Sequence, residues 1–251
     1  MPLAAQSGPV LSEDRHWWFH TRTASLLALL DQYAPPAGLV LDVGGGAGNM
    51  VHHLSRYGRV VGIDNARKPL RVARGRGYLA LLAEATAAPF PDATFSLVAL
   101  LDVIEHCPDD HAVLAEAYRV CSAGGLAVVT TPALSWLWSH NDVDNRHLRR
   151  YSRQNLASLL AEVGFDVLRV TYSFFLVFPA AAGLVLLRKL LGASPSLATP
   201  DEDSAYQVEM EEAPGALNSL LLRAGSLEAR LARRHDLPVG TGLLAVARKP
   251  C

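Results

Sequence analysis

The chain has 251 residues, of which 50% are hydrophobic, and a formal net charge of -1. This length suits one α/β domain with a large core, and a charge so close to zero argues against the broad basic surface of a nucleic-acid-binding protein. The three cysteines, Cys107, Cys121 and Cys251, form no C-x-x-C motif and cannot all pair, which favours a reduced, cytoplasmic setting.

A glycine-rich turn follows the first predicted strand, in the sequence LVLDVGGGAGN of residues 39–49. A continuous apolar run is typical of a buried parallel strand. Glycines directly after it allow a tight turn and a close approach of a ligand to main-chain N–H groups. Because ligands of open α/β sheets bind at the carboxyl ends of strands, this segment predicts a site for a nucleotide-like cofactor.

The spacing of these glycines distinguishes between two kinds of cofactor site. A dinucleotide site has the pattern G-x-G-x-x-G. Gly44 and Gly46 fit this pattern, but Asn49 stands at the third glycine position and Gly48 lies one residue too early. The spacing therefore argues against a nicotinamide dinucleotide.

The rest of the chain alternates between predicted strands and predicted helices. Such alternation is typical of a largely parallel sheet with helices on both faces. The predicted strands after the glycine turn are 59–64, 78–83, 95–101, 126–130, 165–172 and 242–248, with Gly124 and Gly125 as a break before 126–130. The predicted helices are 50–57, 111–120, 154–163 with Ser152 as its cap, and 217–234.

Residues 174–187 carry no charged or hydrogen-bonding side chain, and Arg188 and Lys189 follow directly. A helix that spans a membrane needs about 20 apolar residues, so this run is too short. One interpretation is a buried helix or one that faces a second copy in a homodimer. The other is a surface over 174–191 that contacts a membrane or a lipid tail, with the basic pair at the headgroups.

Acidic residues stand at the ends of three predicted strands. Asp64 lies roughly 20 residues past the glycine turn, where an acid can accept hydrogen bonds from both ribose hydroxyls. Glu84 follows the third strand, where it could accept from an exocyclic amine of a base, and Asp102 follows the fourth. Together with the glycine turn, these acids indicate a built site rather than solvated loops.

The segments LVLDVGGGAGN, VVGIDNA, AEATAAPFPDATFSLVALLDVIEHCPDD and AGGLAVVTTP, in this order over 39–132, resemble the class I S-adenosylmethionine (SAM)-dependent methyltransferases. The resemblance is strongest to the small-molecule type that includes the ubiquinone- and menaquinone-pathway enzymes. It implies a Rossmann-like α/β fold with a seven-stranded, mostly parallel sheet, helices on both faces, and 242–248 as an antiparallel last strand. The expected organisation is one methyltransferase domain over 1–251, with a helical lid over 1–37 and a helical insertion over 174–236.

The resemblance also implies a role for each matching residue. It implies that SAM is the cofactor and S-adenosylhomocysteine (SAH) the product. The expected cofactor contacts are Asp42 and the main chain of Gly44, Gly46 and Gly48 to the methionine part, Asp64 to the ribose, Asn65, Glu84 and Ala85 to the adenine, and Leu101 near the sulfonium. Glu84 departs from the family pattern, which more often has Asp at this position.

Residues 13–22, EDRHWWFHTR, resemble a segment that precedes the sheet in some of these enzymes and closes over the cofactor. By this likeness, Arg22 is expected to pair with the SAM carboxylate, a geometry that suits a guanidinium group. The alternative is a helix whose aromatic side chains pack on the core, with Arg22 in solvent.

Methyl transfer is an in-line displacement that depends largely on positioning, although an oxygen or nitrogen nucleophile can also need a base. His106, just past the fourth strand, is the first candidate base, and Asp102 is a further candidate catalytic residue. Asp102, Glu105 and His106 also look like a metal-ligand set, and a related acidic arrangement is associated with magnesium in ubiquinone-pathway O-methyltransferases. Because magnesium prefers oxygen ligands, His106 would be unusual, and no metal is expected.

The segment 136–152 follows the fifth strand at the same edge of the sheet and concentrates polar residues. A similar His-x-Arg-Arg-Tyr-Ser segment recurs in this methyltransferase type. The functional interpretation is a substrate wall that recognises a phenol, carboxylate or phosphate, against a solvated loop as the alternative. Its candidates are Arg149, Arg150 and Tyr151 for substrate contact, and His140 and His147 as further bases.

The sequence thus favours a methyltransferase that acts on a small, lipid-like or quinone-like acceptor, with O-methylation favoured. One alternative is a SAM-binding protein without turnover, and a nicotinamide-dependent reductase is a weaker one. No nucleic-acid partner is expected, since the basic cluster of 146–153 has no wider basic patch around it.

Overall fold

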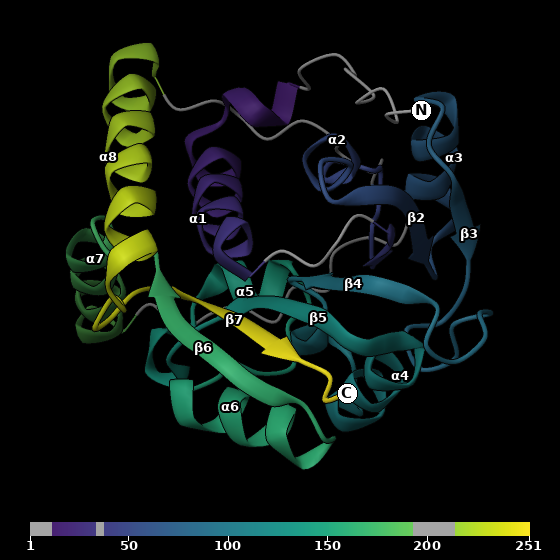
Figure 1. The fold of residues 1–251 in the computed structure, drawn as a ribbon. Helices are drawn as coiled ribbons and strands as arrows, with labels where there is room; N and C mark the ends of the chain where they lie inside the picture. Colours follow the sequence, from purple (N-terminus) through teal and green to yellow (C-terminus); the bar gives the residue numbers. More distant parts are fainter. Residues whose placement is uncertain (1–11, 34–37, 193–213) are drawn as a thin grey trace.

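The computed structural model of the protein describes residues 12–33, 38–192 and 214–251. Figure 1 shows the path of the chain. Its elements are η1 (Ser12–Arg15), α1 (Trp17–Tyr33), β1 (Gly38–Val43), α2 (Val51–Leu54), β2 (Gly58–Asp64), α3 (Arg67–Gly75), β3 (Ala80–Leu82), β4 (Phe95–Leu101), η2 (Ile104–His106), α4 (Asp110–Val120), β5 (Cys121–Pro132), η3 (Ser135–Leu137), α5 (His140–Asp144), α6 (Arg153–Glu162), β6 (Asp166–Ser173), α7 (Phe178–Leu190), α8 (Gly215–Arg234) and β7 (Gly242–Arg248).

The strands form one seven-stranded sheet in the order β3-β2-β1-β4-β5-β7-β6. β1 pairs in parallel with β2 and β4, and β4 pairs in parallel with β5. β7 lies between β5 and β6 and is antiparallel to both. The predicted fold, a mostly parallel sheet with an antiparallel last strand, is therefore confirmed.

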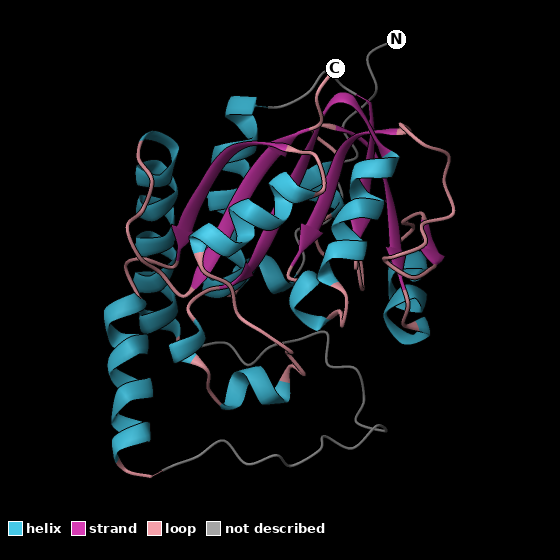
Figure 2. Ribbon diagram, turned by 90° about the horizontal axis from the view of Figure 1, so that it is seen from below, coloured by secondary structure: helices cyan, strands magenta, loops and turns pink. Residues whose placement is uncertain are grey.

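Successive residues of the central strands pack into two different cores, one on each face of the sheet. Leu41 belongs to the core that contains Val113 of α4 and Leu156 of α6. Its neighbour Val40 belongs to the core that contains Leu29 of α1. Figure 2 shows helices on both sides of the strands. Since both faces are covered, the central strands are apolar almost throughout, as expected for parallel strands.

Two predicted boundaries were wrong for local reasons. The helix expected over 50–57 is only the single turn of α2, because the chain turns at once into β2, with Gly58 N–H donating to the Ser55 carbonyl. The glycine pair expected to precede the fifth strand lies inside β5. There Gly124, with a φ of +72°, donates its N–H to the Lys249 carbonyl and so stays within the sheet.

Helices α1 and α8, which come from opposite ends of the chain, pack along each other (Figure 1). A Cβ built on Gly225 of α8 would lie 2.1 Å from Thr21 Oγ1 of α1, so the glycine permits this close approach. The main-chain N–H of Trp17 donates to Asn218 Oδ1 at 3.1 Å. The expected lid and insertion are thus joined in the described part of the chain, whereas 1–11, 34–37 and 193–213 lie outside the described residues.

The buried acid Glu228 connects α8 to the segment that leads into α7. Its carboxylate accepts from the main-chain N–H groups of Phe174 and Leu176. Burial raises the pKa of Glu228, and the hydrogen bonds from the main chain counteract that rise. A carboxylate that caps main-chain donors in this way fixes the course of the chain between β6 and α7.

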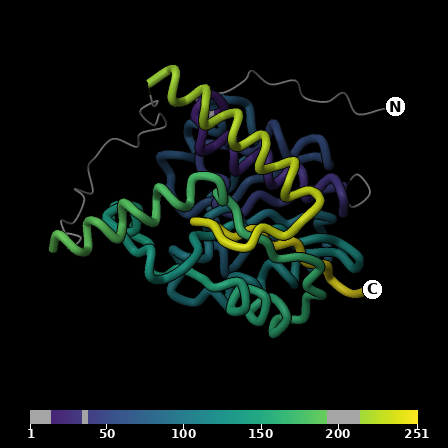
Figure 3. Tube along the Cα trace, turned by 90° about the vertical axis from the view of Figure 1, so that its left-hand side faces the viewer, coloured from purple at the N-terminus to yellow at the C-terminus, as the bar shows by residue number. Residues whose placement is uncertain are grey.

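Helix α7 projects from the body of the protein (Figure 3). Ala182 is its one residue classed as buried, so the interpretation of this segment as a buried helix was wrong. Pro179 lies in the first turn, where it favours the start of a helix. No described helix is both long and apolar enough to cross a bilayer. The exposed leucines, here called the leucine face, are Leu184, Leu186, Leu187, Leu190 and Leu191.

Two helical glycines provide a test of the α1–α8 contact. Gly225→Ala should lower the free energy of unfolding by about 1–3 kcal/mol, because the added methyl group has no room beside Thr21. Gly183→Ala in α7, where a Cβ would meet nothing within 4 Å, should instead raise it by about 0.5–1 kcal/mol. Chemical denaturation measures both changes. If the two substitutions changed the free energy of unfolding by the same amount and in the same direction, the close contact would be contradicted.

Candidate functional site

The glycine turn after β1 has a backbone that only glycine adopts easily. Gly44, Gly46 and Gly48 have φ values of +65°, +53° and +81°. A Cβ on Gly48 would lie 2.3 Å from the Tyr78 ring, and one on Gly44 would lie 2.7 Å from a methyl group of Val103. Steric room, as well as conformation, therefore requires glycine at both positions.

The turn is held by internal hydrogen bonds. The N–H of Gly45 donates to the Ile63 carbonyl, and that of Gly48 donates to the Gly45 carbonyl. The N–H of Gly46 donates to Asp64 Oδ2 at 3.0 Å. These three N–H groups are thus used within the protein, in contrast to the expectation that the turn offers its N–H groups to a ligand. The turn instead offers a surface without side chains that a ligand can approach closely.

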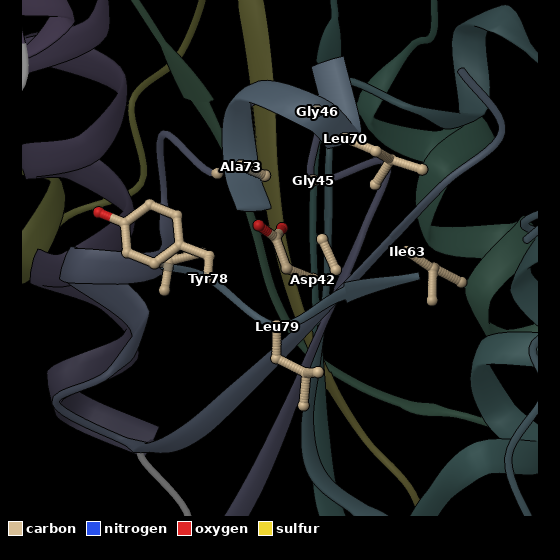
Figure 4. Close-up of a pocket in the computed structure, with 12 residues that line it drawn as sticks. Asp42, Gly45, Gly46, Ile63, Leu70, Ala73, Tyr78 and Leu79 are labelled. Atoms are coloured by element: carbon tan, nitrogen blue, oxygen red, sulfur yellow. The ribbon is translucent and has the colours of Figure 1, made fainter. Parts of the chain in front are cut away.

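Asp42 lies directly below the turn (Figure 4). The residue is 2% exposed, and its Oδ2 has no hydrogen-bond partner. Burial raises the pKa of this carboxyl to about 7, a rise that Arg22 reduces and Asp64 increases. A buried carboxylate oxygen without a donor is costly, and a cationic donor would relieve this cost and restore the charge.

Asp64, Asn65 and Glu84 come together at the ends of β2 and β3. Asp64 accepts from Gly46 through one oxygen and from the Ala66 N–H through the other, at 2.8 Å. Asn65 Nδ2 donates to Glu84 Oε2 at 3.3 Å, and both side chains are exposed. The sequence-predicted ribose and adenine residues therefore form one continuous edge beside the glycine turn.

Arg22 of α1 reaches across to the end of β4. Its Nη1 lies 2.6 Å from Asp102 Oδ2, and its guanidinium carbon lies 4.9 Å from the centre of the Trp18 ring and 5.4 Å from that of Phe19. Arg22 Nε is buried and has no partner. The alternative that Arg22 lies in solvent was therefore wrong. Trp18 and Phe19, two of the aromatic residues expected to pack on the core, instead contact its guanidinium group.

Asp102 has an unusual backbone for a residue with a side chain, with a φ of +58°. This left-handed conformation is least costly for Asp and Asn, and it turns the chain sharply after Leu101. Its second carboxylate oxygen accepts from Thr130 Oγ1 at 3.0 Å, so both oxygens have donors. Asp102 therefore joins α1, β4 and β5 at the carboxyl edge of the sheet.

A small pocket with a volume of about 10 Å³ lies between the glycine turn and Asp42 on one side and Leu70 and Tyr78 on the other. Figure 4 shows these side chains around it. The volume is below the roughly 300–1,000 Å³ of most ligand sites, and the pocket lies on the α3 side of the turn. It is therefore not the cofactor site by itself.

Two of the three predicted candidate bases meet. The rings of His106 and His147 lie 4.9 Å apart between centroids, in an edge-to-face arrangement. Burial and the neighbouring His147 lower the pKa of His106. The fully buried Glu105 lies in the same group, and burial and Asp102 raise the pKa of Glu105. His140 begins α5 and is not a member of this group.

The loop that carries His147 is organised around the buried carboxylate of Asp142. Asp142 accepts from His147 Nδ1 at 2.9 Å, from Arg150 Nε at 2.6 Å and Nη2 at 2.9 Å, and from the Ser139 N–H at 2.8 Å. Burial would raise the pKa of Asp142, but the hydrogen bonds from His147 and Arg150 lower it to about 2. The carboxylate is therefore charged and fixes the loop.

The three predicted substrate residues of this loop are bound to internal partners. Arg150 is paired with Asp142, and the Tyr151 hydroxyl donates to Asp110 at 2.6 Å in a residue only 4% exposed. Arg149, which is about one third exposed, lies 2.9 Å from the same Asp110. A contact of Arg150 or Tyr151 with a substrate would require these bonds to break, so of the three, Arg149 is best placed to meet a ligand.

The chain matches known proteins over part of its length. Residues 41–129 match the family model of a methyltransferase domain. A Mycolicibacterium smegmatis protein named "Probable S-adenosylmethionine-dependent methyltransferase" is 30% identical over 180 residues, which cover 66% of each chain. The ubiquinone biosynthesis O-methyltransferase of Thiobacillus denitrificans is 34% identical over 133 residues, or 46% of this chain and 57% of that protein.

A solved structure agrees in fold over most of the chain. It is Haemonchus contortus phosphoethanolamine N-methyltransferase 2 in complex with SAM. The TM-score is 0.57 and the sequence identity 17%, over 90% of this chain and 52% of that chain. The present chain belongs to the class I SAM-dependent methyltransferases. It spans between 40% and 66% of the lengths of the first curated methyltransferases that it matches.

Sequence reasoning missed two features of this candidate site. The stacking of Trp18 and Phe19 on Arg22 could have been anticipated, since positions i, i+3 and i+4 of a helix lie on one face. The meeting of His147 with Glu105 and His106 could not, because α4 and β5 separate them in the sequence.

The Asp142 centre can be tested by its effect on stability. Asp142→Asn should lower the free energy of unfolding at pH 7 by about 2–3 kcal/mol, because the folded-state pKa lies about two units below the ordinary value. A carboxyl group whose folded-state pKa is lowered stabilises the fold above its ordinary pKa. This stabilisation is lost as the pH falls through the folded-state pKa. The gap between wild type and variant should therefore close from pH 4 towards pH 2. Asp144→Asn, at an exposed position of the same helix, is the control and should change stability by less than about 0.5 kcal/mol.

Proposed function

We propose that this protein transfers a methyl group from SAM to a small-molecule acceptor. The observation that carries the proposal is the unpartnered Oδ2 of buried Asp42 beneath a side-chain-free turn. A SAM ammonium group would give this oxygen its missing donor. Arg22, whose buried Nε is also unpartnered, would hold the SAM carboxylate.

The remaining cofactor contacts follow the edge formed by β2 and β3. Asp64 would accept from the ribose hydroxyls with its remaining lone pairs, and the Asn65–Glu84 pair with Ala85 would lie against the adenine. Gly44, Gly46 and Gly48 would permit close approach of the methionine part, and Leu101 would pack near the sulfonium. When bound, SAM supplies an electrophilic methyl group.

The acceptor would lie against η2 and the loop after α5, where His106 and His147 meet. Burial and His147 lower the pKa of His106, so its neutral form dominates near pH 7 and can accept a proton. Asp102 would position Arg22 rather than act as a base, since both its oxygens have donors. His140, at the start of α5, stays a predicted second-choice base.

A phenolic, quinone-like acceptor with an apolar tail fits the chain best, with oxygen as the methylated atom. The support for oxygen is the likeness to the Thiobacillus ubiquinone biosynthesis O-methyltransferase. The support for an apolar tail is the leucine face beside Arg188 and Lys189. The three cysteines are unpaired, which fits the cytoplasmic setting expected from the sequence.

Turnover tests the proposal directly. Purified protein is incubated with SAM and a panel of phenols and catechols with and without alkyl tails, and SAH formation is followed by mass spectrometry. Acceptor-dependent SAH and a methylated product are expected. Tight SAH binding without turnover on any acceptor would favour the alternative, a SAM-binding protein without catalysis.

The cofactor edge can be tested by binding alone. Asp64→Asn should weaken SAH binding about 10- to 100-fold, because charge-assisted hydrogen bonds to the ribose are worth about 1.5–3 kcal/mol. Asp92→Asn is the control, since Asp92 is an exposed acid paired with Arg119. Calorimetry measures the affinities, and thermal melting verifies that the variant folds. If Asp64→Asn bound SAH with the affinity of the wild type, the proposed contact of Asp64 with the ribose would be wrong.

The leucine face is proposed to contact the lipid surface that holds an apolar acceptor. Leu187→Ser together with Leu190→Ser should reduce co-sedimentation with anionic liposomes several-fold, because Leu187 is 53% and Leu190 84% exposed. Leu82→Ser, which changes an exposed leucine of β3, is the control and should not alter sedimentation. A wild type that stays in the supernatant, and dimerises through these leucines on gel filtration, would favour the homodimer instead.

A further inference from the structure

The C-terminal end of α3 contacts the glycine turn from the side. Arg76, the residue that directly follows the helix, donates from Nη1 to the Ala47 carbonyl at 3.0 Å and to Asn49 Oδ1 at 2.8 Å. Ala47 is 1% exposed, and a main-chain carbonyl in such a place needs a donor from the protein. Arg76 thus connects α3 to the last part of the turn, just before α2.

A Schellman motif at the end of α3 places this arginine. The N–H of Gly77 donates to the Arg74 carbonyl, that of Tyr78 donates to the Ala73 carbonyl, and Gly77 has a φ of +81°. These two bonds define the motif, in which the residue after the cap adopts the left-handed conformation. The motif fixes the direction of the chain on both sides of Gly77, so that Arg76 and Tyr78 both reach the turn.

Tyr78 contacts the turn at a second point. Its ring lies against Gly48, and it lines the pocket beside the turn (Figure 4). The ring also packs on the small core that contains Leu70 of α3 and on the larger core that contains Met50, the residue before α2. Tyr78 therefore couples the position of Gly48 to the position of α3.

The turn needs such external support because its own sequence provides little. Four of the five residues 44–48 are glycines, and glycine loses more conformational freedom on ordering than any other residue. The following helix, α2, has only four residues, and helices this short are not stable by themselves. If the turn were mobile, it would have to be ordered when a ligand binds, at a cost in affinity.

Asn49 acquires a role from this arrangement. It stands where the dinucleotide pattern has its third glycine, which permits close packing of helix and strand in those proteins. Here the side chain at this position instead accepts a hydrogen bond from the cationic Arg76, and such bonds are stronger than those between neutral groups. The residue that argues against a dinucleotide site thus provides the point at which α3 holds the turn.

We propose that Arg76 is a positioning residue for the cofactor, which acts on it through the turn: its bonds to Ala47 and Asn49 hold the turn in the conformation that accepts the ligand. Tyr78 supports the same conformation at Gly48. The inference rests on the proposed function, because SAM or SAH is the ligand that gains from an ordered turn.

Calorimetry with SAH tests the inference in a double-mutant cycle. Arg76→Ala should weaken SAH binding about 10-fold and Asn49→Ala about threefold, and the double variant should lose about 10-fold rather than the product of the two, because both changes remove one shared contact. Arg76→Lys, which keeps the charge and can donate to one of the two acceptors, should bind within about threefold of the wild type. Arg71→Ala is the control, since it removes an exposed arginine of the same helix.

Thermal melting on the same samples separates positioning from stability. A lower melting temperature of Arg76→Ala with unchanged SAH affinity would mean that the arginine only stabilises the fold, and would overturn the inference. A loss of about 30-fold in the double variant would also overturn it, because independent effects multiply. Failure of the wild type to bind SAH would contradict the proposed function itself.

Hydrogen exchange of the ligand-free protein tests the turn without any cofactor. The amides of residues 44–49 should exchange faster in Arg76→Ala than in the wild type or Arg71→Ala, because the turn opens more often once its link to α3 is lost. Equal exchange in all three proteins would show that Arg76 does not hold the turn, whatever the outcome with SAH.

Discussion

The burial of the central strands on both faces is the constraint on which the rest of this structure depends. Leu41 and Val40 point into different cores, so the central strands are apolar on both faces. Polar side chains of these strands are therefore found mainly where the strands end. Asp64 and Asp102 both lie at this edge, and it is there that the protein tolerates an unpartnered carboxylate in Asp42 and a left-handed backbone at Asp102.

Two buried acids organise the segments that surround this edge, by different means. Asp142 is surrounded by cationic and main-chain donors, which keep it charged and lower its pKa. Glu228 has only main-chain donors, and burial raises its pKa. The first fixes a loop beside the histidines, and the second fixes the course of the chain into α7. Arg150, which the sequence pattern assigns to substrate contact, thus stabilises the loop through its bond to Asp142.

The sequence predicted the sheet and the proximity of Asp64 to the glycine turn well, because local signals carry both. An apolar run that ends in glycines marks β1 and its turn, and an acid at the end of β2 must lie beside that turn, since neighbouring parallel strands end at the same edge. The acceptor side was less predictable. His147 meets Glu105 only because Asp142 shapes the loop, and α7 is exposed although its composition resembles a core helix. Such features depend on distant contacts that no periodicity records.

The pairing of α1 with α8 has a consequence for synthesis on the ribosome. Trp17 N–H is bonded to Asn218, a residue 201 positions later, and Thr21 lies against Gly225. Helix α1 is therefore made among the first elements but gains its partner only after the whole sheet except β7 has been synthesised. Until then its apolar side has no α8 to cover it, and contacts this distant in sequence form slowly. The segment that holds Arg22 should consequently be the last part of the candidate site to take its final place.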